Sequence, residues 1–476
     1  MADENKSIKL AVVGGGPGGY AAAFMAAELG MKVTLIDPEE NPGGVCLYRG
    51  CIPSKALLHV AKVVHEAEEA KEWGVTFSKP RFNAKKIRGW KDDIVQKLTG
   101  GLGELSKLRK VEHVRGTAKF KNGTTLIITK NDGSSDSMSY DKIIVATGSK
   151  PAMIPGLEID SPNLLDSTTA LDLENIPKSM LVIGGGYIGL ELGTVYAALG
   201  TKVSVVEMTP GLLPGVDKDM VSVLSKRIKS RFEAVMLKTT VSQMKKQKNG
   251  IKVSFEGEGA DKKAGIYEKV LMSVGRKPRS KDLGLENTQV DVDDKGFIKV
   301  DNTRRTKDPN IYAIGDVARE PMLAHKATHE GRIAAMAIAG QSVIYEPRAI
   351  PAVVFTDPEI AWCGLTQTEA KARKMEVQIV KFPWAASGRA LTLGRNDGLT
   401  KLVVDPETER ILGVGIAGSG AGELIAEGVL AVEMAATVTD VGMSIHPHPT
   451  LSETVMEAAD IFHGHSTHYW RPKRKR

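Results

Sequence analysis

Two cysteines five positions apart are the residues of this sequence whose possible chemistry is easiest to recognise. The chain of 476 residues holds only three cysteines, and Cys46 and Cys51 enclose the run Leu-Tyr-Arg-Gly. A close pair in a chain so poor in cysteine is typical of a redox dithiol or a metal site, and not of a secreted disulfide scaffold. In a regular helix the pair would be about 7.5 Å apart along the axis, so a disulfide needs the bent backbone that Gly50 makes easier. A strained bridge is easily reduced, which suits catalysis.

Two other interpretations of the pair stay open, a metal site and two inert thiols. Zinc would need further ligands, but Cys363 is the only other thiol and no histidine lies at ligand spacing from the pair. Cys363 itself is predicted to be a small buried residue. His463, His465 and His468 could hold a metal near the C-terminus, although a mobile tail is the favoured interpretation. We therefore predict no metal site.

Two segments of the chain, 170 residues apart, share one pattern of elements. In each, a short apolar run leads into a glycine-rich turn, a helix of small residues, a second apolar run and a terminal acid. This order predicts a parallel βαβ unit of the Rossmann type. Helical patterns at about 54–72 and 83–108 follow the first unit. The turn glycines are Gly14, Gly16 and Gly19 in the first unit and Gly184, Gly186 and Gly189 in the second.

The residues of this repeated pattern could hold a dinucleotide. The first glycine of a turn permits the tight bend, the second lets the backbone approach a pyrophosphate, and the third lets helix and strand pack closely. Asp37 and Glu207 would accept hydrogen bonds from ribose hydroxyls. The Glu207 carboxylate would repel a 2′-phosphate, and Met208, Thr209 and Pro210 follow it without an arginine, so NAD is favoured over NADP. Tight turns without a ligand are the alternative.

Composition and charge exclude several classes of protein. Hydrophobic residues make up 42% and charged residues 25%, which are ordinary values for a globular chain long enough for several domains. The net charge is +7, but the basic residues are spread along the chain apart from the tail 471–476, so we predict a solvated tail and no nucleic-acid partner. No apolar run is long enough for a membrane span, and the polar start is not a secretory signal. We expect a cytoplasmic protein.

Together these motifs resemble the flavin-dependent disulfide reductases of the pyridine nucleotide-disulfide oxidoreductase family, and above all the dihydrolipoamide dehydrogenases. The similarity spans nearly the whole chain in family order. The matching runs are Gly43-Gly44-Val45-Cys46, Cys51-Ile52-Pro53-Ser54-Lys55, Ala146-Thr147-Gly148, Gly184 to Gly193, Val274-Gly275-Arg276-Lys277-Pro278, Ala313-Ile314-Gly315-Asp316 and His446 to Glu453. The sequence departs from the family at Tyr48, Asp37 and Pro447, where Asn, Glu and Ala are usual.

The resemblance implies an α/β fold of two Rossmann-like dinucleotide-binding domains and a C-terminal α+β dimerisation domain. An FAD-binding domain would span 1–150 and an NAD-binding domain 151–275. A central domain at 276–348 would complete the FAD site. The interface domain at 349–476, with alternating strands and two helical patterns, would build a homodimer.

The resemblance also implies roles for residues far apart in the sequence. Asp37 would bind the adenosine ribose of FAD, and Asp316 would lie near the ribityl chain. Lys55 would lie near the flavin N5, paired with Glu191. Further flavin contacts would come from Thr147, Gly148 and Ala324. NAD would bind through Gly184, Gly186, Gly189, Glu207, Val241 and Gly275.

The implied reaction is the oxidation of a dithiol by NAD. His448, carried onto the partner's disulfide in the homodimer, would take a proton from a substrate thiol, whose thiolate attacks Cys46. Cys51 would be left as a thiolate under the flavin, and the electrons would pass through FAD to NAD. Glu453 would hold the imidazole of His448 in one tautomer. Alternatively, Glu453 closes a capping box with Thr450 at a helix predicted over 454–461, and both roles could hold.

The implied partner is a lipoyl-bearing acyltransferase of a 2-oxo acid dehydrogenase complex, or the carrier protein of glycine cleavage. Other reductases of the family are the nearest alternatives. A glutathione-type reductase would prefer NADPH, against Glu207, and a mercuric reductase would usually carry a further cysteine pair after Cys363. A soluble transhydrogenase would lack one redox cysteine. A non-catalytic flavoprotein that senses NADH would have no use for Cys46, Cys51 and His448 together.

Overall fold

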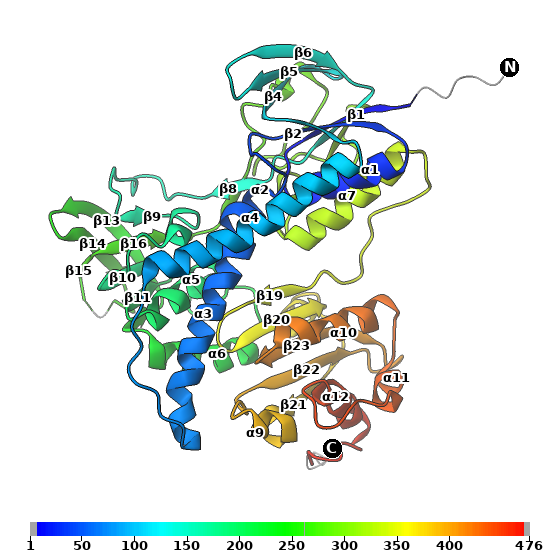
Figure 1. Ribbon diagram of the computed structural model, residues 1–476. Coiled ribbons are helices and arrows are strands. Elements are labelled where there is room, and N and C mark those ends of the chain that lie inside the picture. Colours follow the sequence, from blue (N-terminus) through cyan, green and yellow to red (C-terminus); the bar gives the residue numbers. More distant parts are fainter. Residues whose placement is uncertain (1–6, 261, 471–476) are drawn as a thin grey trace.

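The first predicted βαβ unit forms a five-stranded sheet in the computed structural model, which describes residues 7–260 and 262–470. The strand order is β18-β7-β1-β2-β3, and β1 pairs in parallel with β2 and β7. Helices α1 (Pro17–Glu28) and α7 (Ala324–Ile338) lie side by side against it (Figure 1). The strands are β1 (Lys9–Val13), β2 (Lys32–Ile36), β3 (Glu112–Val114), β7 (Lys142–Val145) and β18 (Ile311–Ala313).

The second unit repeats this arrangement with the strand order β12-β11-β10-β16-β9. Strands β10 and β11 pair in parallel, as β1 and β2 do, and their apolar residues are buried on both faces, as in parallel sheets generally. The acids expected at the strand ends follow β2 and β11 directly. The elements are β9 (Leu164–Leu165), β10 (Ser179–Ile183), α5 (Tyr187–Ala198), β11 (Lys202–Val206), α6 (Lys218–Arg231), β12 (Ala234–Met236) and β16 (Lys269–Met272).

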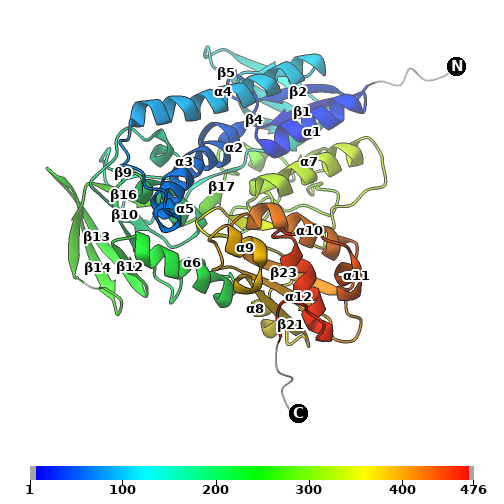
Figure 2. The ribbon, with the colours of Figure 1, turned by 60° about the horizontal axis from the view of Figure 1, so that its bottom comes forward.

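The cysteine run forms two helices that meet at Gly50. Helix α2 (Gly44–Arg49) ends where Gly50 adopts φ −149° and ψ −112°, and α3 (Cys51–Glu69) begins at the next residue. The helix predicted from about 54 to 72 therefore starts three residues earlier, because the chain bends only at the glycine. A short 3-10 helix at Ala70–Trp73 follows it. Helix α4 (Ala84–Leu108) agrees with its prediction and crosses α3 (Figure 2).

Small antiparallel sheets join and extend these two units. One pairs β8 with β17 and connects the segment after the first unit to the segment after the second. The other two are hairpin sheets on the surface of their units (Figure 1). The strands are β4 (Gly116–Asn122), β5 (Thr125–Lys130), β6 (Ser135–Ser139), β8 (Ser149–Pro151), β13 (Thr239–Gln247), β14 (Gly250–Gly257), β15 (Ala264–Tyr267) and β17 (Arg276–Pro278).

The C-terminal region is an antiparallel sheet covered by helices, with the order β19-β20-β23-β22-β21. Two helices were expected here, and the described residues form five, because helices of five or six residues are too short to show a periodic pattern. The elements are β19 (Ala352–Val354), β20 (Glu359–Gly364), α8 (Gln367–Ala372), β21 (Gln378–Pro383), α9 (Gly388–Thr392), β22 (Leu399–Val404), β23 (Ile411–Gly418), α10 (Ala421–Glu433), α11 (Val438–Met443) and α12 (Glu453–His463). Within the described ranges no helix is long and apolar enough to cross a membrane. The predicted fold class, two Rossmann-like units and an α+β region, is confirmed.

Candidate active site

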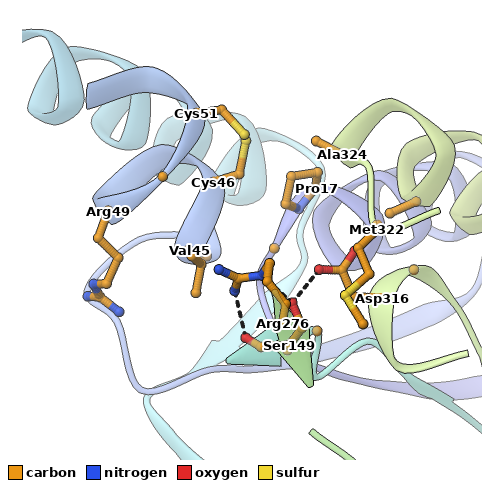
Figure 3. A pocket seen from close by; sticks show the side chains of 18 of the residues that line it. Pro17, Val45, Cys46, Arg49, Cys51, Ser149, Arg276, Asp316, Met322 and Ala324 are labelled. Atoms are coloured by element: carbon orange, nitrogen blue, oxygen red, sulfur yellow. Dashed lines mark hydrogen bonds between the residues drawn. The ribbon is translucent and has the colours of Figure 1, made fainter. Parts of the chain in front are cut away.

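One cavity gathers most of the residues that the sequence predicted for FAD and the dithiol. Its walls come from the first glycine turn, from α2 and α3, from the start of α5 and from the segment that leads into α7 (Figure 3). His448, Glu453 and the residues predicted for NAD are not among its lining residues. The predicted residues that line it are Gly14, Gly16, Asp37, Cys46, Cys51, Lys55, Thr147, Gly148, Glu191, Asp316 and Ala324.

The first glycine turn has the shape that a dinucleotide phosphate requires. Gly14 has φ +108°, and a Cβ there would lie 2.3 Å from the Ala146 carbonyl oxygen. A Cβ at Gly19 would lie 1.8 Å from the Gly14 oxygen, so α1 packs closely on the turn. A Cβ at Gly16 would meet nothing within 4 Å and would project into the cavity space instead. The turn therefore offers backbone amides and the positive end of α1 to an anion, which fits the diphosphate of FAD.

The second glycine turn repeats this geometry. Gly184 has φ +106°, a Cβ at Gly189 would lie 2.5 Å from the Gly184 oxygen, and Gly186 is open to space. Of the other residues implied for NAD, Gly275 has φ +116° directly before β17, and Val241 lies in β13 against the apolar cluster under the sheet. The contact of these residues with NAD stays a prediction.

The acids after β2 and β11 hold the glycine turns in place. Asp37 accepts a hydrogen bond from the Gly15 amide at 2.6 Å, and Glu207 accepts one from the Gly185 amide at 2.7 Å. Both carboxylates are buried. A carboxylate has lone pairs for more than one donor, so these bonds leave capacity for a ribose hydroxyl. The hydrogen bonds from the turns were not predicted from the sequence, and the binding of a ribose by these two acids stays a prediction.

The two thiols of the predicted redox pair are neighbours in the cavity wall but differ in protonation. Cys46 lies in α2 and Cys51 is the first residue of α3, and both are free thiols (Figure 3). The Cys46 thiol donates a hydrogen bond to the Cys51 sulfur, which raises the pKa of Cys46 far above its ordinary value. The same bond, together with the charge of Lys55 and against the effect of burial, lowers the pKa of Cys51 to about 7. Of the two sulfurs, Cys51 is therefore the one that ionises more readily.

Lys55 and Glu191 form an ion pair beside the thiols. Lys55 Nζ in α3 lies 2.8 Å from Glu191 Oε2 in α5, and the carboxylate is buried. The other Glu191 oxygen accepts a hydrogen bond at 3.0 Å from the amide of Phe355, whose ring centre is 4.4 Å from Lys55 Nζ. The pair thus joins helix α3 to the second unit and to the C-terminal region. The predicted pairing is present, and its role in the reaction stays a prediction.

A chain of polar contacts that the sequence did not reveal surrounds Asp316. Ser149 donates a hydrogen bond of 2.5 Å to the Asp316 carboxylate, and Arg276 Nε donates one of 2.7 Å to the Ser149 hydroxyl (Figure 3). Tyr187, from the second glycine turn, lines the same cavity, and burial raises its pKa to about 12, so its hydroxyl stays neutral. These residues are ordinary polar types far apart in the sequence, and Ser149 lies outside the runs that matched the family.

A buried group of charges fixes the turn that carries Asp316. Glu330 in α7 is buried and lies 3.0 Å from Arg304 and 3.3 Å from Lys326. It also accepts a hydrogen bond of 2.6 Å from the Gly315 amide. Burial lowers the pKa of Lys326, while the adjacent Glu330 carboxylate opposes this effect. Lys326 and Glu330 are four residues apart in α7, which follows the matched run that ends at Asp316. This spacing is the one signal in the sequence that could have indicated the pair.

His448 and Glu453 form a pair at the opposite end of the chain. His448 Nδ1 lies 2.8 Å from one Glu453 oxygen, and the other oxygen accepts a hydrogen bond of 2.7 Å from the Thr450 amide. Burial raises the pKa of Glu453, but these two hydrogen bonds outweigh it and lower the value, so the carboxylate stays ionised. The capping-box alternative is wrong in its details, because Ser452 and not Thr450 is the N-cap of α12. Glu453 nevertheless holds both the imidazole and the backbone of this turn.

Two of the histidines near the C-terminus contact other side chains of the chain. His463 ends α12 with Nε2 3.1 Å from the Thr439 hydroxyl, and His468 Nδ1 lies 2.6 Å from Glu457. The buried Glu457 carboxylate therefore contacts the chain at His468, and the mobility of the tail stays a prediction. The described residues contain no group of acids, histidines and cysteines that could hold a metal. Cys363 is buried, as predicted, and the tail 471–476 lies outside the described residues.

Comparison with known proteins identifies the family of this chain. Residues 8–331 match the family model of the pyridine nucleotide-disulphide oxidoreductases, and residues 350–459 match the model of their dimerisation domain. A dihydrolipoyl dehydrogenase of Vibrio parahaemolyticus is 46% identical over 97% of this chain and 98% of its own length. One from Geobacillus stearothermophilus is 44% identical over 96% of each chain.

Solved structures agree with these relatives. LpdA from Mycobacterium tuberculosis superposes with a TM-score of 0.89 at 26% identity, over 95% of this chain and 99% of that one. The flavoprotein disulfide reductase RclA from Escherichia coli, in a Cu(II) complex, gives a TM-score of 0.85 at 25% identity, over 96% and 99% of the two chains. The resemblance predicted from the motifs is confirmed. The chain belongs to the pyridine nucleotide-disulphide oxidoreductases, and within them to the dihydrolipoyl dehydrogenases.

Proposed function

We propose that this chain is one subunit of a homodimeric FAD enzyme that oxidises protein-bound dihydrolipoyl groups and reduces NAD+. The observation that carries the proposal is that the free thiols of Cys46 and Cys51 lie side by side in the wall of the cavity that begins at the first glycine turn. The family membership supports the same reaction and both cofactors. An electron pair that leaves the dithiol therefore has a dinucleotide site directly beside it.

The residues of the cavity fit FAD. The glycine turn would hold the diphosphate, Asp37 the adenosine ribose, and Asp316 the ribityl chain, with Thr147, Gly148 and Ala324 along the wall. When bound, FAD accepts an electron pair from the dithiol and transfers it as a hydride to NAD+. Lys55, fixed by Glu191, places a positive charge beside the Cys51 sulfur. The protein therefore supplies alignment and charge for a reaction between sulfur and the cofactor.

The dithiol carries out the exchange with the substrate. In the oxidised enzyme Cys46 and Cys51 share a disulfide, and His448 of the partner subunit takes the proton from one substrate thiol. The substrate thiolate attacks the Cys46 sulfur, which breaks the disulfide and releases Cys51 as a thiolate. The second substrate thiol then attacks the mixed disulfide, so that the substrate leaves as a cyclic disulfide and Cys46 regains a thiol. The low pKa of Cys51 makes it a good leaving group in the first step.

A second subunit is needed because His448 does not lie in the cavity of its own chain. Its side chain is 71% exposed on the C-terminal region, and the matched dimerisation domain supports a homodimer. Large apolar side chains are exposed on the same region, and Ile445 is 99% exposed. A two-fold dimer that buries this apolar face would bring each His448 to the dithiol of the other chain. The exposed apolar residues are Leu430, Met434, Met443 and Ile445.

The dithiol does not determine which nicotinamide cofactor or which partner protein the enzyme uses. We assign NAD rather than NADP to the second site, because the buried Glu207 carboxylate would repel a 2′-phosphate. The partner would be a lipoyl-bearing acyltransferase of a 2-oxo acid dehydrogenase complex or the carrier protein of glycine cleavage. A cytoplasmic location stays a prediction made from the sequence.

A steady-state assay of the purified protein tests this proposal against its alternatives. NADH should form from dihydrolipoamide and NAD+, and NADP+ should be a much poorer acceptor. The Cys46→Ser variant is the control that keeps the cavity but removes the exchange. Efficient reduction of glutathione disulfide by NADPH would favour the glutathione-type alternative. A yellow protein that binds NADH but turns over no dithiol would favour a sensor.

A further inference from the structure

Tyr48 and Arg49, the last two residues of helix α2, attach this helix to a segment outside it. The Arg49 guanidinium forms an ion pair with Glu39. The Tyr48 hydroxyl donates a hydrogen bond of 3.0 Å to the Asn41 carbonyl oxygen and lies 3.2 Å from the Asn41 amide. Glu39 and Asn41 belong to the stretch 37–41 after β2, which we call the Asp37 segment. Helix α2, with Cys46, is therefore attached to this segment at two points.

The Asp37 segment is attached in turn to the first glycine turn. Asp37 accepts hydrogen bonds from the amide of Gly15 at 2.6 Å and from the amide of Glu39 at 3.0 Å. Directly beyond the segment, the Gly43 amide donates a bond of 2.7 Å to the Gly15 carbonyl oxygen. One short stretch of chain thus contacts both the turn that would hold the FAD diphosphate and the helix that carries a redox thiol.

Charge gives Arg49 a second effect on the cofactor site. Asp37, Glu39 and Arg49 all line the cavity, and FAD carries an anionic diphosphate. Without Arg49 the Glu39 carboxylate would add to the negative charge that faces this group. The pair is only partly exposed, with 40% of the Arg49 and 24% of the Glu39 side chain accessible, so solvent screens it incompletely. Arg49 therefore neutralises an acid in the cofactor wall.

We propose that Arg49 is a positioning residue that couples FAD binding to the placement of Cys46. This inference rests on the proposed function, because it needs FAD in the cavity and the dithiol beside it. Arg49 acts through the Asp37 segment and not through its charge on sulfur, since the charges that act on the thiols come from Lys55 and Glu191.

The test measures the release of FAD from the purified holoenzyme together with the alkylation of its thiols. Arg49→Gln should speed FAD release about tenfold, because it breaks the pair and leaves Glu39 unpaired, and Glu39→Gln should speed it about threefold. The double variant should match Glu39→Gln at about threefold, because two residues of one pair do not act independently. Arg109→Gln is the matched control, since Arg109 pairs with Glu28 outside the cavity. It should leave FAD release unchanged.

Alkylation of the two thiols in the NADH-reduced protein provides the second readout. Iodoacetamide should react about threefold faster in Arg49→Gln than in wild type, with the same dependence on pH, because the helix is looser while the thiol charges are unchanged. The inference is overturned if FAD release in Arg49→Gln stays within twofold of wild type, if the double variant shows the product of the single effects, or if the pH profile of alkylation shifts. All variants should still oxidise dihydrolipoamide. A wild-type protein without this activity would refute the proposed function, whatever the release rates.

Discussion

Cys46 and Cys51 have identical side chains, yet their surroundings give their sulfurs different tasks. The pKa of Cys46 is raised far above its ordinary value, whereas that of Cys51 is lowered to about 7. Before any ligand binds, Cys46 is therefore suited to the exchange with substrate, and Cys51 is suited to holding negative charge. Sequence could name both cysteines from their spacing. It could not assign the protonation states, because these depend on Lys55 and on a hydrogen bond whose geometry is set by the bend at Gly50.

The lowered pKa of Cys51 predicts a titration in the reduced enzyme. The thiolate should be present above about pH 7 and should be lost as the pH falls through this value, because protonation of Cys51 breaks the arrangement with Cys46. The long-wavelength absorbance of a thiolate beside oxidised flavin reports it. Lys55→Gln should move the midpoint to higher pH by removing a stabilising positive charge. Lys62→Gln on the exposed face of the same helix is the control. An identical midpoint in all three proteins would contradict the assignment.

The exposed His448 predicts a loss of dithiol oxidation without a loss of cofactor. His448→Gln should lower the rate with dihydrolipoamide by about a hundredfold or more, because no base remains for the substrate thiol. FAD content should not change, since His448 does not line the cavity. His468→Gln is a matched control, because His468 forms the same kind of pair with Glu457 in the same region. A fully active His448→Gln enzyme would remove this residue from the mechanism.

At the scale of elements, the strongest sequence patterns were the ones that the structure reproduces most closely. Both βαβ units could be predicted because glycine turns and buried parallel strands leave dense, regular signals. The start of α3 could not, because Pro53 reads as a helix start while the backbone already turns at Gly50. The short helices α8, α9 and α11 have no periodicity to detect, and the structure shows that Thr366, Ser387 and Thr437 cap them.

The glycine turn predicts that two similar substitutions have different consequences. Gly19→Ala should destabilise the fold by about 1–3 kcal/mol, because its Cβ would collide with the Gly14 oxygen at 1.8 Å. Gly16→Ala has space in the protein, so its melting temperature without FAD should be unchanged while FAD binding weakens at least about tenfold. Gly101→Ala in α4, which also meets nothing within 4 Å, is the control. Equal loss of stability in Gly16→Ala and Gly19→Ala would contradict this view of the turn.

At the scale of the whole molecule, the site is assembled from segments that only tertiary structure brings together. Asp316 accepts a hydrogen bond from Ser149, which in turn accepts one from Arg276. The turn that carries Asp316 is held by a hydrogen bond from Gly315 to Glu330. No local pattern marks these contacts, because each residue is separated from its partners by many others along the chain. The family resemblance supplied the positions of Asp316 and His448, whereas composition and periodicity alone would have left both as ordinary surface residues.

A shared active site predicts that two inactive variants can restore one another. Cys46→Ser lacks the attacked sulfur and His448→Gln lacks the base, so each homodimer should be inactive. Subunits mixed by co-expression should recover about a quarter of the wild-type activity, because half of the random dimers are hybrids with one intact site of two. Mixing the separately purified dimers without subunit exchange is the control and should remain inactive. No recovery in verified hybrids would place His448 in the site of its own chain.

The central claim is that the Cys46–Cys51 dithiol passes an electron pair through FAD to NAD+, and anaerobic titration tests it most directly. Addition of one equivalent of dihydrolipoamide per subunit to the purified yellow protein should produce the long-wavelength absorbance of a thiolate beside the flavin. NAD+ added next should remove that absorbance and form NADH in equal amount. A colourless protein, or a flavin that dihydrolipoamide leaves unchanged while NADH reduces it, would contradict the account.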